Sequence, residues 1–245
     1  MLKNKKIIKS EKKTKKTKKI NLDKIIPSLE EMLKAGVHFG HRTSKWHAKM
    51  SPYIFTTRNN VHIFDLEKTE EKLRKALEFL HEIKKKKGII IFVGTKVAVK
   101  EITQESAKEI KMPYINERWI GGTLTNFEVI SKRLKHIRDL EKRQKEGELK
   151  KYTKKEQHDF NIEIQKLNRQ FGGIKEITKL PEALLVIDVY KEKLAVKEAK
   201  MKGIPVVGLC DTNANPTDVD YPIPVNDDAI SSLKLILGAI VKVLK

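Results

Sequence analysis

The sequence predicts an α/β protein: an open parallel sheet of about five strands covered by helices on both faces, with an inserted antiparallel helical (coiled-coil) hairpin. Short continuous apolar runs alternate with amphipathic segments, as buried parallel strands and their crossover helices require. One long stretch, from about 123 to 171, shows only helical periodicity. We therefore expect one α/β domain over residues 21–245 that carries the 123–171 hairpin as an insertion.

The first elements are marked by local signals. Ser28 and Glu31 have the spacing of a capping box, which starts a helix by satisfying two free backbone amides. A second helix is expected from Glu70 to a stop at Gly88, with an apolar stripe of leucines. The apolar run Ile89–Val93 then predicts a buried strand.

The same alternation continues along the chain. It predicts a helix near 96–111, strands at 114–115 and 183–189, a helix at 191–202, a strand at 205–210 and a last helix at 228–244. These elements leave the stretch from about 123 to 171 as the one break in the rhythm.

Two narrow apolar seams predict that this stretch forms two helices packed together. Gly147 offers a break between them, and Thr153 with Glu156 forms a second capping box that starts the return helix. The seam residues lie three or four positions apart: Phe127, Ile130, Leu134 and Ile137 on the first arm, and Phe160, Ile164, Leu167 and Phe171 on the second.

Charge points to a polyanionic partner. Lysine and arginine number 52 against 32 acids, a formal net charge of +20. Residues 1–19 hold ten lysines and one acid, so we expect 1–20 to be a disordered lysine-rich extension. The rest of the chain is basic too, which favours nucleic acid as the counter-charge. No apolar run is long enough for a membrane span and no basic amphipathic helix opens the chain, so a membrane partner is not expected. A membrane-surface adaptor driven by the lysine run is kept as an alternative.

The chain has one cysteine, Cys210, in an apolar run, where it is expected to be a buried small hydrophobe. The N-terminus lacks the apolar core of a secretory signal and the arginine and serine content of a transit peptide. These features predict a cytoplasmic protein.

Enzyme signatures are missing. The strand ending at Val93 is followed by Gly94, Thr95 and Lys96, but the earlier glycine of a phosphate-binding Walker loop is absent, and no G-x-G-x-x-G occurs. We expect no catalytic residues, cofactor or small-molecule substrate. The alternative is a nucleotide- or phosphosugar-binding enzyme that uses the strand ends near Gly94, Asp188 and Asp211.

Two groups of residues resemble metal ligands, but neither is predicted to hold a metal ion. Asp188 and Asp211 follow apolar strands and could chelate magnesium with Asp227 or Asp228, but capping of helices and loops explains them more simply. The spacing His38-x-x-His41 resembles part of a zinc site. It has no accompanying cysteine, so nucleic-acid contact is the favoured interpretation.

Basic side chains interleaved with aromatic and imidazole rings are typical of RNA-binding surfaces, because cations bind phosphates and rings stack on bases. We expect this surface to combine the region 36–62, the turn 118–126 and basic hairpin positions. The candidate RNA-binding residues are His38, His41, Arg42, Lys45, Trp46, Lys49, Arg58, Asn59, Asn60, His62, Lys96, Arg118, Trp119, Thr123, Thr125, Asn126, Lys132 and Arg133.

Several long motifs closely resemble the bacterial small-subunit ribosomal protein family conventionally numbered two. The motifs are Leu33-Lys-Ala-Gly-Val-His-Phe-Gly-His41, Phe92-Val-Gly-Thr-Lys96, Glu117-Arg-Trp-Ile-Gly-Gly-Thr-Leu-Thr-Asn-Phe127, Val219-Asp-Tyr-Pro-Ile-Pro224 and Asn226-Asp-Asp-Ala-Ile230. With shorter blocks between them, they cover nearly everything from Ser28 to Leu244.

The resemblance implies a structural constituent of the small ribosomal subunit that binds small-subunit (16S-type) rRNA on the solvent side, between head and body. It also implies contacts with neighbouring ribosomal proteins, among them the large RNA-capturing protein numbered one. The chain departs from the family pattern in its lysine extension and at Val97-Ala98, where a lysine and a glutamine are common. Asn215 stands where relatives often have aspartate, which weakens an ion-binding role for that loop.

Overall fold

The computed structural model describes residues 22–245, so the lysine-rich extension predicted at 1–20 lies outside it. Its main sheet has five strands, in the order β5-β4-β6-β7-β8, and all neighbours are parallel. The strands are β5 (Tyr114–Ile115), β4 (Ile90–Val93), β6 (Ala183–Ile187), β7 (Val206–Cys210) and β8 (Tyr221–Pro224). This confirms the predicted open parallel sheet.

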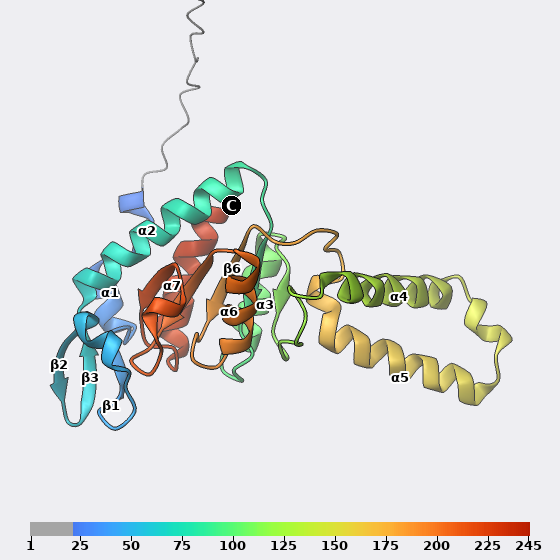
Figure 1. Cartoon of the computed structure of the whole chain (residues 1–245), viewed down its shortest axis with the longest axis horizontal. Helices are drawn as coiled ribbons and strands as arrows, with labels where there is room; N and C mark the ends of the chain where they lie inside the picture. Colours follow the sequence, from blue (N-terminus) through green and yellow to red (C-terminus); the bar gives the residue numbers. More distant parts are fainter. Residues whose placement is uncertain (1–21) are drawn as a thin grey trace, which may run out of the picture.

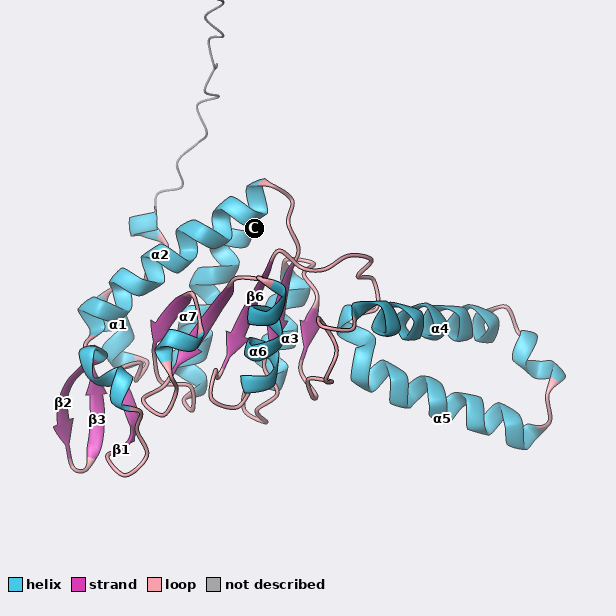
Figure 2. Cartoon of the chain, viewed as in Figure 1, coloured by secondary structure: helices cyan, strands magenta, loops and turns pink. Residues whose placement is uncertain are grey.

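Helices cover both faces of this sheet (Figures 1 and 2). The helices α2 (Leu66–Lys85), α3 (Lys100–Glu109) and α7 (Ile230–Leu244) share one apolar core with one face, while α6 (Lys193–Lys202) and the base of the hairpin share a second core with the other. Within β4, Ile90 and Phe92 belong to the first core, and Ile91 and Val93 to the second. A strand buried on both faces explains why its sequence is continuously apolar.

Most predicted elements were confirmed, with shifts of a few residues at their ends. The short helix α1 (Leu29–Lys34) begins with the expected capping box between Ser28 and Glu31. Helix α2 begins at Leu66, four residues before the predicted start, because Asp65 caps it by accepting from the Glu67 amide. Cys210 is completely buried, as expected.

Helices α4 (Phe127–Lys145) and α5 (Lys154–Phe171) lie side by side and project from the sheet (Figure 1). Gly147 has a φ of 75° between them, and Thr153 and Glu156 form the predicted capping box before α5. The base of α4 packs into the second core, whereas Leu140, Leu149 and Ile164 form a separate small cluster near the far end. A coiled-coil geometry for these two helices stays a prediction.

A second sheet was not predicted. Strands β1 (Phe39–Arg42), β2 (Ile54–Arg58) and β3 (Val61–Phe64) form a three-stranded antiparallel sheet in the order β1-β3-β2. Asn59 and Asn60 make the two-residue loop between β2 and β3, with φ values of 49° and 60°. Asparagine tolerates this left-handed conformation, so both residues have a structural role that the sequence analysis missed.

The remaining short elements are the 3-10 segments at Leu22–Lys24, Ala48–Tyr53, Glu148–Lys151, Gly172–Ile174 and Pro216–Asp218. Across residues 22–245, none of the helices combines the length and apolarity that crossing a bilayer demands.

Candidate nucleic-acid interface

The small sheet is held against the carboxyl end of β7 by hydrogen bonds to one threonine. Thr212 Oγ1 accepts from the His41 amide at 2.9 Å, and its carbonyl accepts from the His47 amide at 2.7 Å. A Cβ at Gly40 would lie only 2.5 Å from the Thr212 side chain, so glycine permits this close approach. The loop from 43 to 49 is thereby fixed beside the ends of the main strands.

Exposed cations and an indole ring gather on this small sheet and its loop. Trp46 is 45% exposed, and its ring lies 5.3 Å from that of His62. We call the exposed set the sheet-end surface: Arg42, Lys45, Trp46, Lys49 and Arg58. Guanidinium and ammonium groups beside an accessible aromatic ring are what an RNA surface needs.

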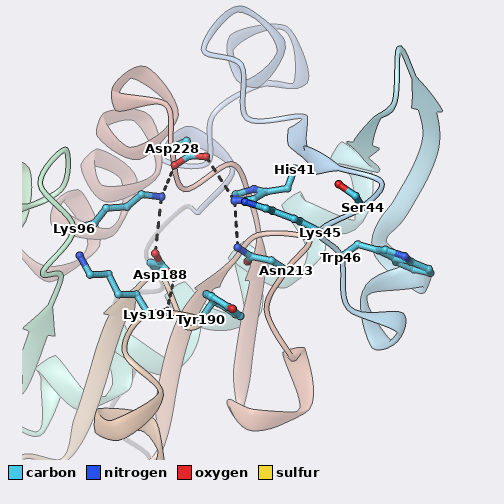
Figure 3. A pocket seen from close by; sticks show the side chains of 10 residues that line it. All are labelled: His41, Ser44, Lys45, Trp46, Lys96, Asp188, Tyr190, Lys191, Asn213 and Asp228. Atoms are coloured by element: carbon cyan, nitrogen blue, oxygen red, sulfur yellow. Dashed lines mark hydrogen bonds and ion pairs between the residues drawn. The ribbon is translucent and has the colours of Figure 1, made fainter.

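A pocket of about 610 Å³ opens between the small sheet and the carboxyl ends of the main strands (Figure 3). Residues from five separate segments line it: His41, Ser44, Lys45, Trp46, Lys96, Asp188, Tyr190, Lys191, Asn213 and Asp228. Lysines and carboxylates therefore share the pocket, and the carboxylates weaken it as an anion site.

Lys96 lies among these carboxylates. Its Nζ is 2.8 Å from Asp227 Oδ1 and 3.9 Å from Asp188 Oδ2, and it also pairs with Asp228. Burial would lower the pKa of Lys96, but the hydrogen bonds to Asp227 and Asp228 raise it above its ordinary value. Burial, reinforced by the charges of Asp188 and Asp211, raises the pKa of Asp227. Lys96 is occupied by these ion pairs and is half-buried, so its predicted contact with RNA needs a rearrangement.

His41 completes the same cluster. Its Nδ1 lies 3.1 Å from Asp211 Oδ2 and its Nε2 3.7 Å from Asp228 Oδ2. The hydrogen bond to Asp211 raises the pKa of His41, although burial opposes it. The imidazolium form of His41 would therefore tie the small sheet to the main domain.

Four groups of this cluster could hold a divalent cation. His41, Asp211, Asp227 and Asp228 each offer one ligand atom, and these atoms lie within 4.8 Å of one another. One nitrogen and three carboxylate oxygens suit zinc better than magnesium, which prefers oxygen alone. His38, the partner considered from the sequence, is not in the group; its ring lies against Phe39 instead.

The turn from Arg118 to Asn126 is ordered by a carboxylate from α6. Glu198 is 4% exposed and accepts from Trp119 Nε1 at 3.2 Å, the Gly122 amide at 2.8 Å and the Leu124 amide at 2.9 Å. The amide and hydroxyl of Thr125 both donate to it at 3.2 Å. Burial would raise the pKa of Glu198, but these hydrogen bonds lower it by more. The residue therefore stays ionised and holds the turn in one conformation.

Residues beside this turn form a second exposed group. We call Arg118, Asn126, Lys132 and Arg133 the hairpin-base surface, because they lie on the turn and the first part of α4. Lys132 pairs with Glu128 at 2.7 Å on the outside of that helix. Figure 1 shows the small sheet and the hairpin on opposite sides of the main sheet, so the two surfaces are separate.

Three candidate residues turn out to be buried and need correction. His62, Trp119 and Thr123 are 8%, 5% and 3% exposed. Trp119 donates to Glu198, and the Thr123 hydroxyl donates to the Ile120 carbonyl at 2.6 Å. Their side chains support the turn and the small sheet from inside, and we remove them from the set proposed to touch RNA.

Sequence reasoning also missed two features of the structure: the carboxylate that orders the turn and a row of exposed lysines on α6. Glu198 lies more than 70 residues beyond the turn that it holds, and no local pattern marks it. The exposed lysines of α6 were missed as well. Their spacing, Lys193, Lys197 and Lys200, was a usable signal, because residues three and four apart share one side of a helix.

Fold and candidate site together define a class: an α/β protein whose exposed candidate side chains are basic and aromatic, as in structural proteins that bind polyanions. Comparison with known proteins is more specific. The family model described as ribosomal protein S2 matches residues 32–245. The chain belongs to the ribosomal protein S2 family.

Curated relatives agree. The chain is 48% identical over 209 residues to small ribosomal subunit protein uS2 of Dehalococcoides mccartyi, which covers 85% of both chains. It is 49% identical over 213 residues to the protein of that name from Hahella chejuensis, which covers 87% of this chain and 84% of the relative. The family is one of structural small-subunit ribosomal proteins, and it gives no support to an enzyme acting at the strand ends.

Proposed function

We propose that this chain is a structural component of the small ribosomal subunit and binds its rRNA through the sheet-end surface and the hairpin-base surface. The observation that carries the proposal is the concentration of exposed cations, with Trp46 among them, on the two surfaces of an S2 family member. Cations there would set the position of the RNA, and the ring of Trp46 would add stacking on an unpaired base.

In this role the α/β domain of residues 21–245 is the scaffold, the 123–171 hairpin is an arm inserted in it, and residues 1–20 are an extension. The protein acts in the cytoplasmic ribosome, between head and body, and catalyses no reaction. Its partners are small-subunit rRNA and neighbouring ribosomal proteins, with the RNA-capturing protein numbered one among the candidates.

The salt dependence of rRNA binding tests this proposal. Each phosphate contact contributes about 0.7 to 0.9 to the slope of log affinity against log salt, so the slope should be steep. Arg118→Ala should lower it by about one contact, since the Arg118 side chain is exposed. Lys242→Ala, an exposed lysine of α7 on the other face of the sheet, is the matched control and should leave the slope unchanged.

Sedimentation gives the second readout. The intact chain should comigrate with small subunits and with complete ribosomes, and should remain bound after a salt wash that removes loosely held basic proteins. A flat salt response together with recovery at the top of the gradient would overturn the proposal.

A further inference from the structure

Helix α6 separates its charges between two sides. Residues 191–202, which are α6 and the two residues before it, contain five lysines and two glutamates, a sequence that resembles an ordinary mixed-charge surface helix. In the structure all five lysines are exposed, whereas Glu192 and Glu198 are each 4% exposed. The outer side of this helix therefore carries positive charge without acids of its own.

The two glutamates are held inside by specific partners. Glu198 accepts the five hydrogen bonds from residues 119–125 described above. Glu192 accepts from the amide of Thr95 at 3.2 Å and also from its hydroxyl. Both carboxylates accept hydrogen bonds from loops on the inner side of the helix. They are therefore not available to pair with the lysines on its outer side.

The lysines also form few ion pairs with acids of other elements. Within residues 22–245, the one ion pair that these five lysines make is Lys200 Nζ to Asp218 Oδ1 at 3.2 Å. Lys193 Nζ lies 4.0 Å from the centre of the Tyr190 ring, a cation–π contact that keeps its charge. Lys193, Lys197 and Lys200 border a hollow of about 280 Å³, which Asp218 also lines.

Helix α6 also lies between the two surfaces proposed to bind RNA. Beside the hairpin-base surface, Gly121 of the 118–126 turn lies near α6, because a Cβ built on it would be 3.8 Å from Leu194 Cδ2. At the sheet-end surface, Lys49 Nζ binds the Thr217 hydroxyl at 2.9 Å, while Lys200 Nζ binds the carbonyl of the same residue at 3.3 Å. The helix thus touches or adjoins both surfaces.

We propose that the outer side of α6 is a third RNA-binding surface, a ridge of Lys193, Lys197 and Lys200 that holds the phosphate backbone of rRNA between the other two. From the first to the last of these lysines the helix rises about 10.5 Å. A basic stripe along one helix, flanked at both ends by basic surfaces, matches a continuous polyanion better than an isolated acidic patch. The inference rests on the proposed function and extends it.

The test uses the full chain, purified rRNA and two matched double variants. Lys193→Ala with Lys197→Ala removes two charges that make no ion pair within residues 22–245. Lys234→Ala with Lys242→Ala does the same on α7, across the sheet. The α6 variant should lower the salt slope by about 1.4 to 1.8, that is by two contacts, and the α7 variant should not. Both pairs are exposed, and equal thermal midpoints would show that folding is intact.

Lysine acetylation of the RNA complex gives a direct second measurement. Lys193 and Lys197 should be protected by bound rRNA, while Lys234 and Lys242 should react as in the free protein. An unchanged slope and unprotected α6 lysines, with Arg118→Ala still lowering the slope, would overturn the ridge and leave the proposed function standing. Loss of every effect, including that of Arg118→Ala, would overturn the proposed function itself.

One further outcome concerns the class of partner. If the α6 variant binds free rRNA normally but fails to enter small subunits, the ridge faces an acidic ribosomal protein. That result would also overturn the RNA assignment of α6.

Discussion

Helix α6 and the hairpin of α4 and α5 are both rich in lysine and glutamate, yet they place their acids differently. In the hairpin, glutamates stay on the surface and pair with nearby cations, as in Lys132–Glu128 at 2.7 Å and Arg143–Glu148 at 3.3 Å. At α6, the N-cap Glu192 and Glu198 are both buried, and of the five lysines at 191–202 only Lys200 pairs with an acid within residues 22–245. The placement of acids, more than the number of lysines, therefore decides which helix presents a strong positive surface.

The largest expected effect is from Glu198→Ala. It leaves Trp119 Nε1 and the amides of Gly122, Leu124 and Thr125 without their acceptor. A buried donor without a partner costs about 1 to 3 kcal/mol, so we expect a loss of at least about 3 kcal/mol in the free energy of unfolding. Urea denaturation measures it. A loss below about 1 kcal/mol would mean that water can replace the carboxylate of Glu198, and that Glu198 is not needed to hold the turn.

Leu140→Ala tests whether the hairpin has stability of its own. Leu140 is 2% exposed and packs with Leu149 and Ile164, away from the main cores. Leucine-to-alanine changes in a core cost about 2 to 5 kcal/mol, and we expect the lower end because the cluster is small. Hydrogen exchange should quicken around residues 140–164 and stay unchanged in the main sheet. Faster exchange throughout would show instead that the hairpin and the sheet unfold together.

Glu198 of α6 and Glu192, the N-cap of the same helix, should respond to pH with opposite sign. The folded state lowers the pKa of Glu198, so its stabilisation is complete above the ordinary carboxyl value of about 4.3 and is lost as pH falls through the folded value. Burial raises the pKa of Glu192 despite hydrogen bonds from Thr95, so its charge opposes folding at neutral pH and the penalty disappears in acid.

The conservative variants measure this difference. At neutral pH, Glu198→Gln should lower the free energy of unfolding, and Glu192→Gln should leave it equal or raise it. The Glu192→Gln difference from the parent chain should shrink as pH falls toward about 4.3, because the folded pKa of Glu192 is raised. The Glu198→Gln difference should shrink only below about 4.3, because the folded pKa of Glu198 is lowered. Equal losses for the two variants at neutral pH would contradict the opposite pKa directions.

The smallest expected effect is from Glu128→Gln in the hairpin. Glu128 and Lys132 form an exposed ion pair one helical turn apart, and such pairs are screened by solvent and salt. The thermal midpoint should not change measurably. Affinity for rRNA should rise slightly, because Lys132 would lose its competing carboxylate. A clear drop in the thermal midpoint would show that exposed ion pairs contribute substantially to the stability of the hairpin, contrary to this expectation.

Elements that are buried on both faces could be predicted from the sequence, because burial requires a continuous run of apolar residues. The strands β4, β6 and β7 are buried on both faces, so their continuous apolar runs stand out. Strand β8 lacked that signal because its sequence contains Pro222 and Pro224, which an edge strand tolerates. In the small sheet, β2 is largely exposed, so it shows little apolar alternation.

The site was harder to predict because it depends on contacts between distant segments. Exposed cations such as Arg42 and Arg118 were correctly placed at the surface by their chemistry. In the sequence, Trp119 resembles a surface aromatic residue. In the structure it is buried and donates a hydrogen bond to Glu198, a distant residue that no local pattern connects with it. Asn59 and Asn60 were interpreted as RNA contacts, although the same pair is also a signal for a two-residue hairpin loop.

The burial of Cys210 allows this chain to be labelled selectively at an introduced cysteine. Its thiol is completely buried, burial raises its pKa, and it is the single cysteine of the sequence. Thiol reagents act on exposed thiolates, so the native protein should not react with them. A cysteine introduced on the outside, as in Lys197→Cys, would then be the one reactive handle on residues 22–245. Fluorophores or cleavage reagents could be attached there without first removing a native cysteine.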